Sequence, residues 1–244
     1  SLLVIGPNAS NIACMLGNYF GISDQVTTVL EGVAARMPEG TELDYRIGCT
    51  HEEPVRNPKD WVSFEASRRN YIIAAMGVSP LMEGEEGDAI MAEDYGDRSS
   101  LELPEVQLDL LRKIRQRSDG GNTGARLVVL LFSGSPIASP ELHELADTIL
   151  QVWYPGEAGG DAVASVLWGD LQPAGRLPVT VPKSTGVLPP FNDYAMAGRG
   201  YRGMKPEDIL YPFGFGLSYA DCAVTEVETE GSVSGDSGLL LTVQ

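Results

Sequence analysis

The sequence predicts an α/β fold, a three-layer αβα sandwich around about six mostly parallel strands. Short runs of the chain are apolar at every position, as expected of strands that are covered on both faces. Segments with helical spacing separate these runs, which is typical of a parallel sheet with helices on both sides. The predicted strands are residues 2–5, 43–47, 71–76, 127–132, 149–154 and 177–181.

The predicted helices alternate with these strands. Residues 25–37 form an amphipathic helix, because their apolar side chains recur at i, i+3, i+4 and i+7. A second helix begins at Pro104, a residue that the first helical turn tolerates, and ends near basic side chains that suit the helix dipole. Shorter helices are expected over residues 60–69, 139–148 and 158–168.

The last part of the chain departs from this alternation. Residues 183–218 are rich in Pro, Gly and aromatic side chains, and we expect an ordered but irregular segment there. Residues 222–229 and 239–243 are strand-like and predict a hairpin. Because a lone hairpin is marginal in water, we expect residues 219–244 to be the truncated start of a second β domain, after a first domain at 1–218.

Composition excludes several classes of function. The chain has 17 Lys and Arg against 34 Asp and Glu, a formal charge of −17, so it repels nucleic-acid backbones and anionic membrane surfaces. No apolar run approaches the roughly 20 residues of a membrane span. The chain opens directly on an apolar run, which is expected of a piece of a longer protein. We expect a soluble protein, and its compartment (cytoplasmic, secreted or periplasmic) stays open.

The cysteines and histidines do not predict a metal or a cofactor. Cys14, Cys49 and Cys222 are far apart and are all expected to be small buried apolar residues. His51 and His143 lack the companions that a zinc site needs. We therefore expect neither a bound metal nor a cofactor.

Two common α/β chemistries are disfavoured. Gly156–Gly160 follows a strand, but its spacing is not that of a dinucleotide fingerprint, and Glu157 would oppose a phosphate. These small residues more simply allow close packing of a helix on the sheet. Ser133 and Ser135 follow another strand without the spacing of a serine nucleophile.

An acidic loop is the strongest candidate for chemistry. Residues 83–97 follow the third predicted strand, and ligand sites in open α/β sheets lie beyond the carboxyl ends of strands. Crowded carboxylates raise one another's pKa, which suits a general acid. A solvated loop and an oxygen-ligand calcium site are the alternatives from chemistry alone. The loop holds seven carboxylates: Glu83, Glu85, Glu86, Asp88, Glu93, Asp94 and Asp97.

Several long motifs resemble one family. Residues 154–164, 167–170 and 173–180 (YPGEAGGDAVA, LWGD and PAGRLPVT) resemble the C-terminal α/β domain of glycoside hydrolase family three. Residues 200–202 and 210–219 (GYR and LYPFGFGLSY), and the opening LVIGPNA with LGNY, fit the same family. Together these motifs extend over residues 1–219.

The resemblance implies a retaining exo-β-glycosidase of the β-xylosidase or β-glucosidase branch, acting on oligosaccharides. It implies an N-terminal (β/α)8 barrel that carries the nucleophilic Asp, then this sandwich, then a fibronectin-type-III-like domain. No segment of this chain resembles the barrel. The implied partners are therefore the oligosaccharide and the barrel of the same protein, and the chain alone is expected to be inactive.

The resemblance also places the general acid/base in the acidic loop. Relatives carry this Glu in a Gly-Glu-Gly or Ser-Glu-Gly triplet ahead of Asp-Arg, and residues 84–86 read Gly-Glu-Glu. We assign Glu85, with Glu86 and Glu83 as alternatives, since Glu86 stands where Gly is common. Asp97 and Arg98 are expected to support the site, more simply by anchoring the loop. The alternative function is a non-catalytic domain that shapes the barrel's site or binds sugar.

Overall fold

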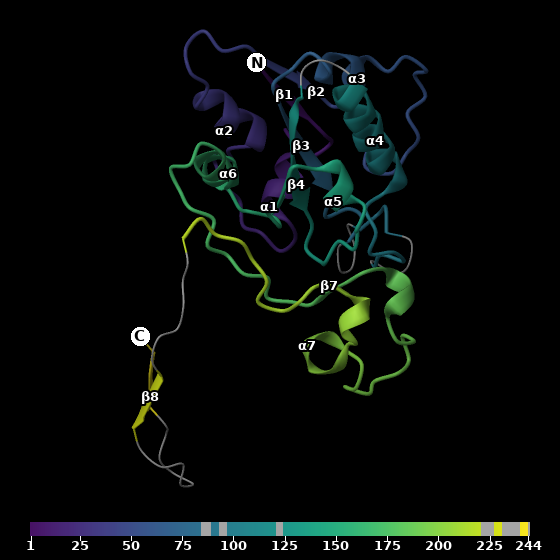
Figure 1. Ribbon diagram of the computed structural model, residues 1–244, viewed down its shortest axis with the longest axis vertical. Coiled ribbons are helices and arrows are strands. Elements are labelled where there is room, and N and C mark those ends of the chain that lie inside the picture. Colours follow the sequence, from purple (N-terminus) through teal and green to yellow (C-terminus); the bar gives the residue numbers. More distant parts are fainter. Residues whose placement is uncertain (84–88, 93–96, 121–123, 221–226, 231–239, 244) are drawn as a thin grey trace.

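A parallel sheet of five strands forms the centre of the molecule (Figure 1). The computed structural model describes residues 1–83, 89–92, 97–120, 124–220, 227–230 and 240–243. The strand order is β2-β1-β3-β4-β5, and each neighbouring pair runs parallel. The strands are β1 (Leu2–Ile5), β2 (Leu43–Arg46), β3 (Tyr71–Gly77), β4 (Arg126–Phe132) and β5 (Thr148–Gln151).

Helices cover both faces of this sheet, so the predicted three-layer α/β class is confirmed (Figure 1). Strand residues alternate between two cores: Leu3 and Ile72 pack with one helical layer, and Val4 and Ile73 with the other. The first layer contains α3 (Trp61–Ala66), α4 (Glu105–Gly120) and α5 (Leu142–Leu145). The second contains α1 (Ile12–Leu16), α2 (Val29–Ala35) and α6 (Gly159–Leu167).

Helices α2 and α6 approach each other closely through glycine. A Cβ atom on Gly160 would lie 2.0 Å from the carbonyl oxygen of Thr28, and one on Gly32 would lie 2.2 Å from that of Gly160. Thr28 itself caps α2, because its hydroxyl accepts the N–H of Glu31 while the Glu31 carboxylate accepts the Thr28 N–H. The small residues of this turn do allow close packing, but Gly160 packs a helix against another helix and not, as expected, against the sheet.

The sixth predicted strand lies outside the main sheet. The structure has only β6 (Val181–Pro182) there, and it pairs antiparallel with β7 (Ile209–Tyr211). Leu177 donates its N–H to the carbonyl of Phe215 and accepts that of Gly214, both at 2.8 Å. The returning chain therefore takes up the hydrogen bonds that a sixth parallel strand would have offered to the sheet, and Pro182 has no N–H for a ladder.

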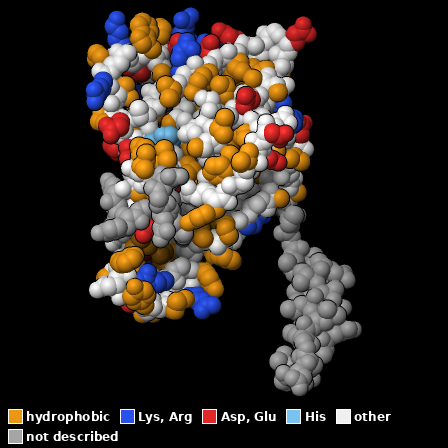
Figure 2. Space-filling view, turned by 180° about the vertical axis from the view of Figure 1, so that it is seen from behind, with side chains coloured by type: hydrophobic (Ala, Val, Ile, Leu, Met, Phe, Trp, Pro, Cys, Tyr) orange, Lys and Arg blue, Asp and Glu red, His pale blue; other side chains and the backbone are white. Residues whose placement is uncertain are grey.

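The segment after β6 forms an ordered arm with little regular structure, as predicted. It contains η1 (Thr185–Val187), α7 (Gly200–Gly203), η2 (Pro206–Asp208) and β7. Figure 2 shows hydrophobic side chains on the lobe that this arm builds at the bottom of the molecule. The exposed large apolar residues of the arm are Leu188, Phe191, Tyr194, Met196, Tyr201, Phe213, Phe215, Leu217 and Tyr219.

The predicted C-terminal hairpin is present as β8 (Val227–Glu230) and β9 (Leu240–Val243), which pair antiparallel. It stands apart from the sheet in Figure 1. Cys14 and Cys49 are buried and unpaired, as expected, while Cys222 lies outside the described residues. Among the described helices, none is long and apolar enough to cross a membrane.

Candidate functional site

Polar side chains from three neighbouring strands meet beyond the carboxyl edge of the sheet. Glu83 follows the end of β3, Gly134 and Ser135 follow β4, and Tyr154 follows β5. Because β3, β4 and β5 are parallel and adjacent, their carboxyl ends lie at one edge. This edge is where ligands bind in open α/β sheets, and it is where the acidic loop begins.

The Glu83 carboxylate is buried and surrounded by hydrogen-bond donors. Its Oε1 accepts the Tyr154 hydroxyl at 2.6 Å and the Gly134 N–H, and its Oε2 accepts the Ser135 hydroxyl at 2.6 Å. Only 6% of the side chain is exposed. Burial, together with the nearby charge of Glu83, raises the pKa of the Tyr154 phenol, so this hydroxyl stays protonated and donates.

Arg98 completes the cluster from the far end of the loop. Its Nη1 lies 3.5 Å from Glu83 Oε2 and donates to Ser135 Oγ at 3.1 Å, while Nη2 donates to the Glu102 carbonyl at 3.1 Å. The Arg98 side chain is 10% exposed. Residues 83 and 98, which bound the acidic segment, are thereby held against each other.

The turn that leaves β3 is fixed by a buried amide. Gln107 of α4 accepts the N–H of Gly77 at 2.8 Å and donates to the Gly77 carbonyl at 2.7 Å and to the His51 carbonyl at 2.9 Å. Gly77 has a φ of 122°, and a Cβ there would lie 2.0 Å from the carbonyl oxygen of Phe132. A glycine is therefore required where the chain turns toward the loop.

A second buried amide supports the same turn from β1. Asn8 donates to the carbonyls of Met76 and Val78 at 3.4 and 3.2 Å, so its Oδ1 must act as the acceptor. Oδ1 accepts from Cys14 Sγ at 3.0 Å and from His51 Nε2 at 2.7 Å, which places the imidazole proton on Nε2. Burial lowers the pKa of His51. Burial and the nearby charge of Glu83 raise the pKa of Cys14 to about 12. Both groups are therefore uncharged and serve to position the turn.

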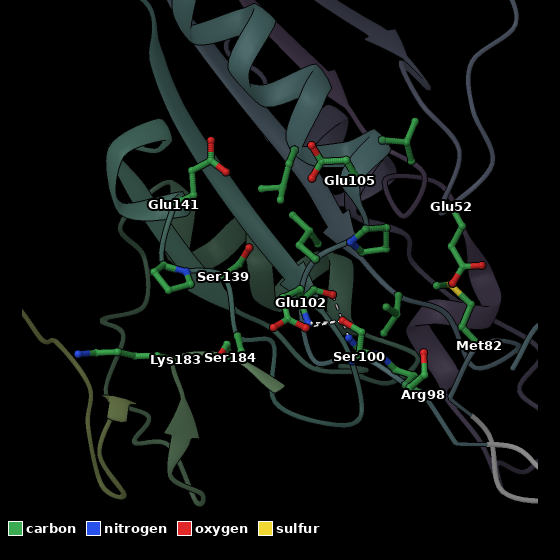
Figure 3. A pocket seen from close by; sticks show the side chains of 18 of the residues that line it. Glu52, Met82, Arg98, Ser100, Glu102, Glu105, Ser139, Glu141, Lys183 and Ser184 are labelled. Atoms are coloured by element: carbon green, nitrogen blue, oxygen red, sulfur yellow. Dashed lines mark hydrogen bonds between the residues drawn. The ribbon is translucent and has the colours of Figure 1, made fainter. Parts of the chain in front are cut away.

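A pocket of about 680 Å³ lies beside this cluster (Figure 3). Met82 and Arg98 line it, but Glu83 does not. Glu102 lines it: burial opposes the ionisation of its carboxyl, yet hydrogen bonds from Ser100 and Thr185 lower its pKa to about 2. The dashed lines in Figure 3 mark hydrogen bonds between pocket residues. The pocket is adjacent to the loop and separate from the Glu83 carboxylate.

The structure describes some of the site residues that the sequence predicts and leaves others outside its described part. Glu85 and Glu86 lie outside the described residues. Glu83 lies in the buried cluster described above, and Arg98 pairs with it. Asp97 is exposed and directly precedes Arg98 in the chain. In the described part of the chain, no group of three or more His, Cys, Asp and Glu side chains could hold a metal ion.

Sequence reasoning missed the donors that hold Glu83. It treated Ser135 only as a failed nucleophile and Tyr154 only as part of a family motif. The available signal was position: Gly134 and Ser135 come two and three residues after β4, the neighbour of β3, and Tyr154 comes three residues after β5, the next strand along. A search for polar residues just past the carboxyl ends of adjacent parallel strands would have grouped them with Glu83.

Comparison with known proteins identifies the family of this domain. Residues 1–219 match the family described as the glycosyl hydrolase family 3 C-terminal domain. A xylan 1,4-β-xylosidase of Xylanibacter ruminicola is 42% identical over 167 residues, which cover 68% of this chain and 18% of that protein. A periplasmic β-glucosidase of Salmonella typhimurium is 30% identical over 260 residues, covering 93% of this chain and 32% of that protein.

The fold is similar to that of solved enzymes. A family 3 exo-β-xylosidase in complex with a xylobiose aziridine probe superposes with a TM-score of 0.72 at 27% identity. The match covers 91% of this chain and 28% of that one. The chain thus spans less than a third of the length of the solved xylosidase.

Proposed function

The chain belongs to glycosyl hydrolase family 3, and on that premise we propose that it is part of a retaining exo-β-glycosidase. The enzyme would be a β-xylosidase or β-glucosidase that hydrolyses terminal β-linked sugars from oligosaccharides. The observation that carries the proposal is the family match over residues 1–219, which includes the acidic loop at the carboxyl end of β3. Relatives named as β-xylosidase and β-glucosidase support both substrate options.

We propose that Glu85 is the general acid/base of this enzyme. It lies two residues beyond Glu83, whose position at the carboxyl edge is known, and within the Gly-Glu-Glu triplet. Glu83 itself is poorly suited to the role. Both of its oxygens already accept hydrogen bonds and its side chain is 6% exposed, so it could not readily approach a glycosidic oxygen. Glu86 stays an alternative.

The chemistry requires a second carboxylate from another domain. In a retaining glycosidase the two carboxyl groups lie about 5–5.5 Å apart. The nucleophile attacks the anomeric carbon while the acid gives its proton to the leaving oxygen, and the glycosidic bond breaks. The resulting carboxylate then takes a proton from water, which attacks the glycosyl ester, releases the nucleophile and regenerates the acid. Glu85 would supply both proton transfers.

We propose that the nucleophile comes from an N-terminal (β/α)8 barrel in the same protein. The relatives extend well beyond the matched region, which leaves length for such a domain. Residues 188–219 of the arm support a contact with another domain, because they expose many aromatic side chains and exposed apolar patches are typical of interfaces. Residues 1–218 would then form the sandwich and 219–244 the start of a fibronectin-type-III-like domain.

The test uses the full-length protein with aryl β-xylosides and β-glucosides. We expect hydrolysis with a β-anomer as the first product, observed by proton NMR before mutarotation. Glu85→Gln should abolish turnover of poor leaving groups yet spare activated ones better, because an activated leaving group departs without a proton and only the later attack of water is slowed. An α-anomer would refute the retaining mechanism. Equal loss on both substrates would favour the alternative, a non-catalytic domain that shapes the barrel's site or binds sugar.

A further inference from the structure

We infer that Glu83, Arg98, Ser135 and Tyr154 form a clasp that positions the general acid/base segment. The clasp joins the two ends of residues 84–97 to each other and to the carboxyl ends of β4 and β5. These four are positioning residues, and their catalytic effect rests on the function proposed above. Their structural effect on the segment does not.

The contacts make the clasp a closed unit. Ser135 Oγ donates to Glu83 Oε2 at 2.6 Å and accepts from Arg98 Nη1 at 3.1 Å, so it bridges the two ends of the segment. Tyr154 donates to the other oxygen of Glu83 at 2.6 Å. Hydrogen bonds to a charged partner are stronger than neutral ones, and a buried ion pair that loses a partner leaves an uncompensated charge. The four groups therefore act together.

The backbone beside Tyr154 is held in a strained conformation. Trp153 has a φ of 56°, in the left-handed region that a bulky residue rarely adopts. Gly17 packs against the Tyr154 side chain so closely that a Cβ there would lie 2.9 Å from Cδ2. Strained conformations persist only where surrounding structure determines them, often at functional sites. Here the strain and the packing both direct the Tyr154 hydroxyl to Glu83.

The backbone after β4 constrains the same oxygen of Glu83 that Tyr154 contacts. Gly134 donates its N–H to Glu83 Oε1, and a Cβ at Gly134 would lie 3.3 Å from both Glu83 Oε1 and the Tyr154 ring. The chain between the two ends is also tied back, because the Met91 N–H donates to the Leu81 carbonyl at 2.9 Å. Glu83 is thus placed by three strands, and Glu85 follows two residues later.

The experiment uses the full-length protein with Tyr154→Phe, which removes only the hydroxyl. The matched control is Tyr211→Phe, because Tyr211 lies on the arm and its hydroxyl bonds to His143 of α5. Hydrogen exchange of peptides spanning residues 83–98 is measured by mass spectrometry in the resting protein. We expect these peptides to exchange faster in Tyr154→Phe than in the wild type, and at the wild-type rate in the control. Unchanged exchange in Tyr154→Phe overturns the clasp, whatever happens to activity.

A kinetic measurement tests the catalytic part. Misplacement of a reacting group by about 1 Å can cost roughly 100-fold, so we expect kcat/KM on poor leaving groups to fall roughly 10- to 100-fold in Tyr154→Phe. The loss on a dinitrophenyl glycoside should be much smaller, since that leaving group needs no proton. Equal losses on both substrates overturn the positioning role.

Glu83→Gln provides a second variant, with Glu141→Gln as its control because Glu141 pairs with Arg112 away from the clasp. The same pattern of exchange and leaving-group dependence is expected. If the full-length wild type cleaves neither aryl glycoside, the proposed function fails, and hydrogen exchange still decides whether the clasp orders residues 84–97.

Discussion

The Gln107 side chain offers the most direct check on how the loop's starting point is held. Gln107→Leu removes three hydrogen bonds, two with Gly77 and one with the His51 carbonyl, at 2.7–2.9 Å. Gln107 is fully buried, so its former partners have no water to replace it. Each hydrogen bond contributes about 1 kcal/mol, and each orphaned buried group costs about 1–3 kcal/mol.

Leucine regains some of this loss through apolar burial. We therefore expect the free energy of unfolding to fall by about 2–4 kcal/mol in Gln107→Leu. Gln116→Leu is the matched control, because Gln116 lies on the same helix and is exposed, and surface changes usually stay within about 0.5 kcal/mol. Urea denaturation of the 244-residue chain, followed by tryptophan fluorescence, measures both. Equal stabilities of the two variants would show that the Gln107 hydrogen bonds do not hold this turn.

Three further predictions follow from other contacts. Gly160→Ala should lower the free energy of unfolding by about 1–3 kcal/mol, because the added Cβ meets the Thr28 carbonyl. Gly175→Ala, with open space around it, should be neutral, and equal melting temperatures of the two variants would contradict this. The Glu102 pKa of about 2 lies below its ordinary 4.5, so its ionised form stabilises the fold above pH 4.5 and this contribution is lost as pH falls toward 2. The stability advantage of wild type over Glu102→Gln should thus shrink between pH 7 and pH 3, and a constant advantage would count against it. Finally, the 244-residue chain alone should release no nitrophenol from aryl β-xylosides or β-glucosides, and measurable release would disprove the need for a second domain.

Local pattern was sufficient to predict most of the fold. The apolar strands and amphipathic helices alternate along the sequence, and each of the first five predicted strands is present in the sheet. The prediction of a sixth strand in the main sheet was wrong, because residues 177–181 form a short, largely apolar run that fits a sheet strand and an irregular buried segment equally well. Its partner, the chain around Phe215, comes from more than 30 residues later, and pairing at that distance is not visible in local pattern.

The site was only partly predictable for a related reason. The acidic loop is a contiguous feature, so composition reveals it. The cluster around Glu83 is assembled from three strands, and the contact between Glu83 and Tyr154 spans 71 positions. Glu83, Glu85 and Glu86 are also chemically alike in sequence. Only the burial of the Glu83 side chain, which the sequence does not reveal, shows that it is poorly placed to act as an acid that must reach its substrate.

Azide rescue of Glu85→Gly decides whether the acidic loop supplies the general acid/base through Glu85. The measurement uses the full-length protein with an activated aryl glycoside. We expect azide to restore turnover and to yield a β-glycosyl azide, because the small anion attacks the glycosyl intermediate without needing the missing base. Glu83→Gly keeps Glu85 and should be accelerated by azide far less. Equal azide rescue of the two variants, or no rescue of Glu85→Gly, would rule out Glu85 as the general acid/base.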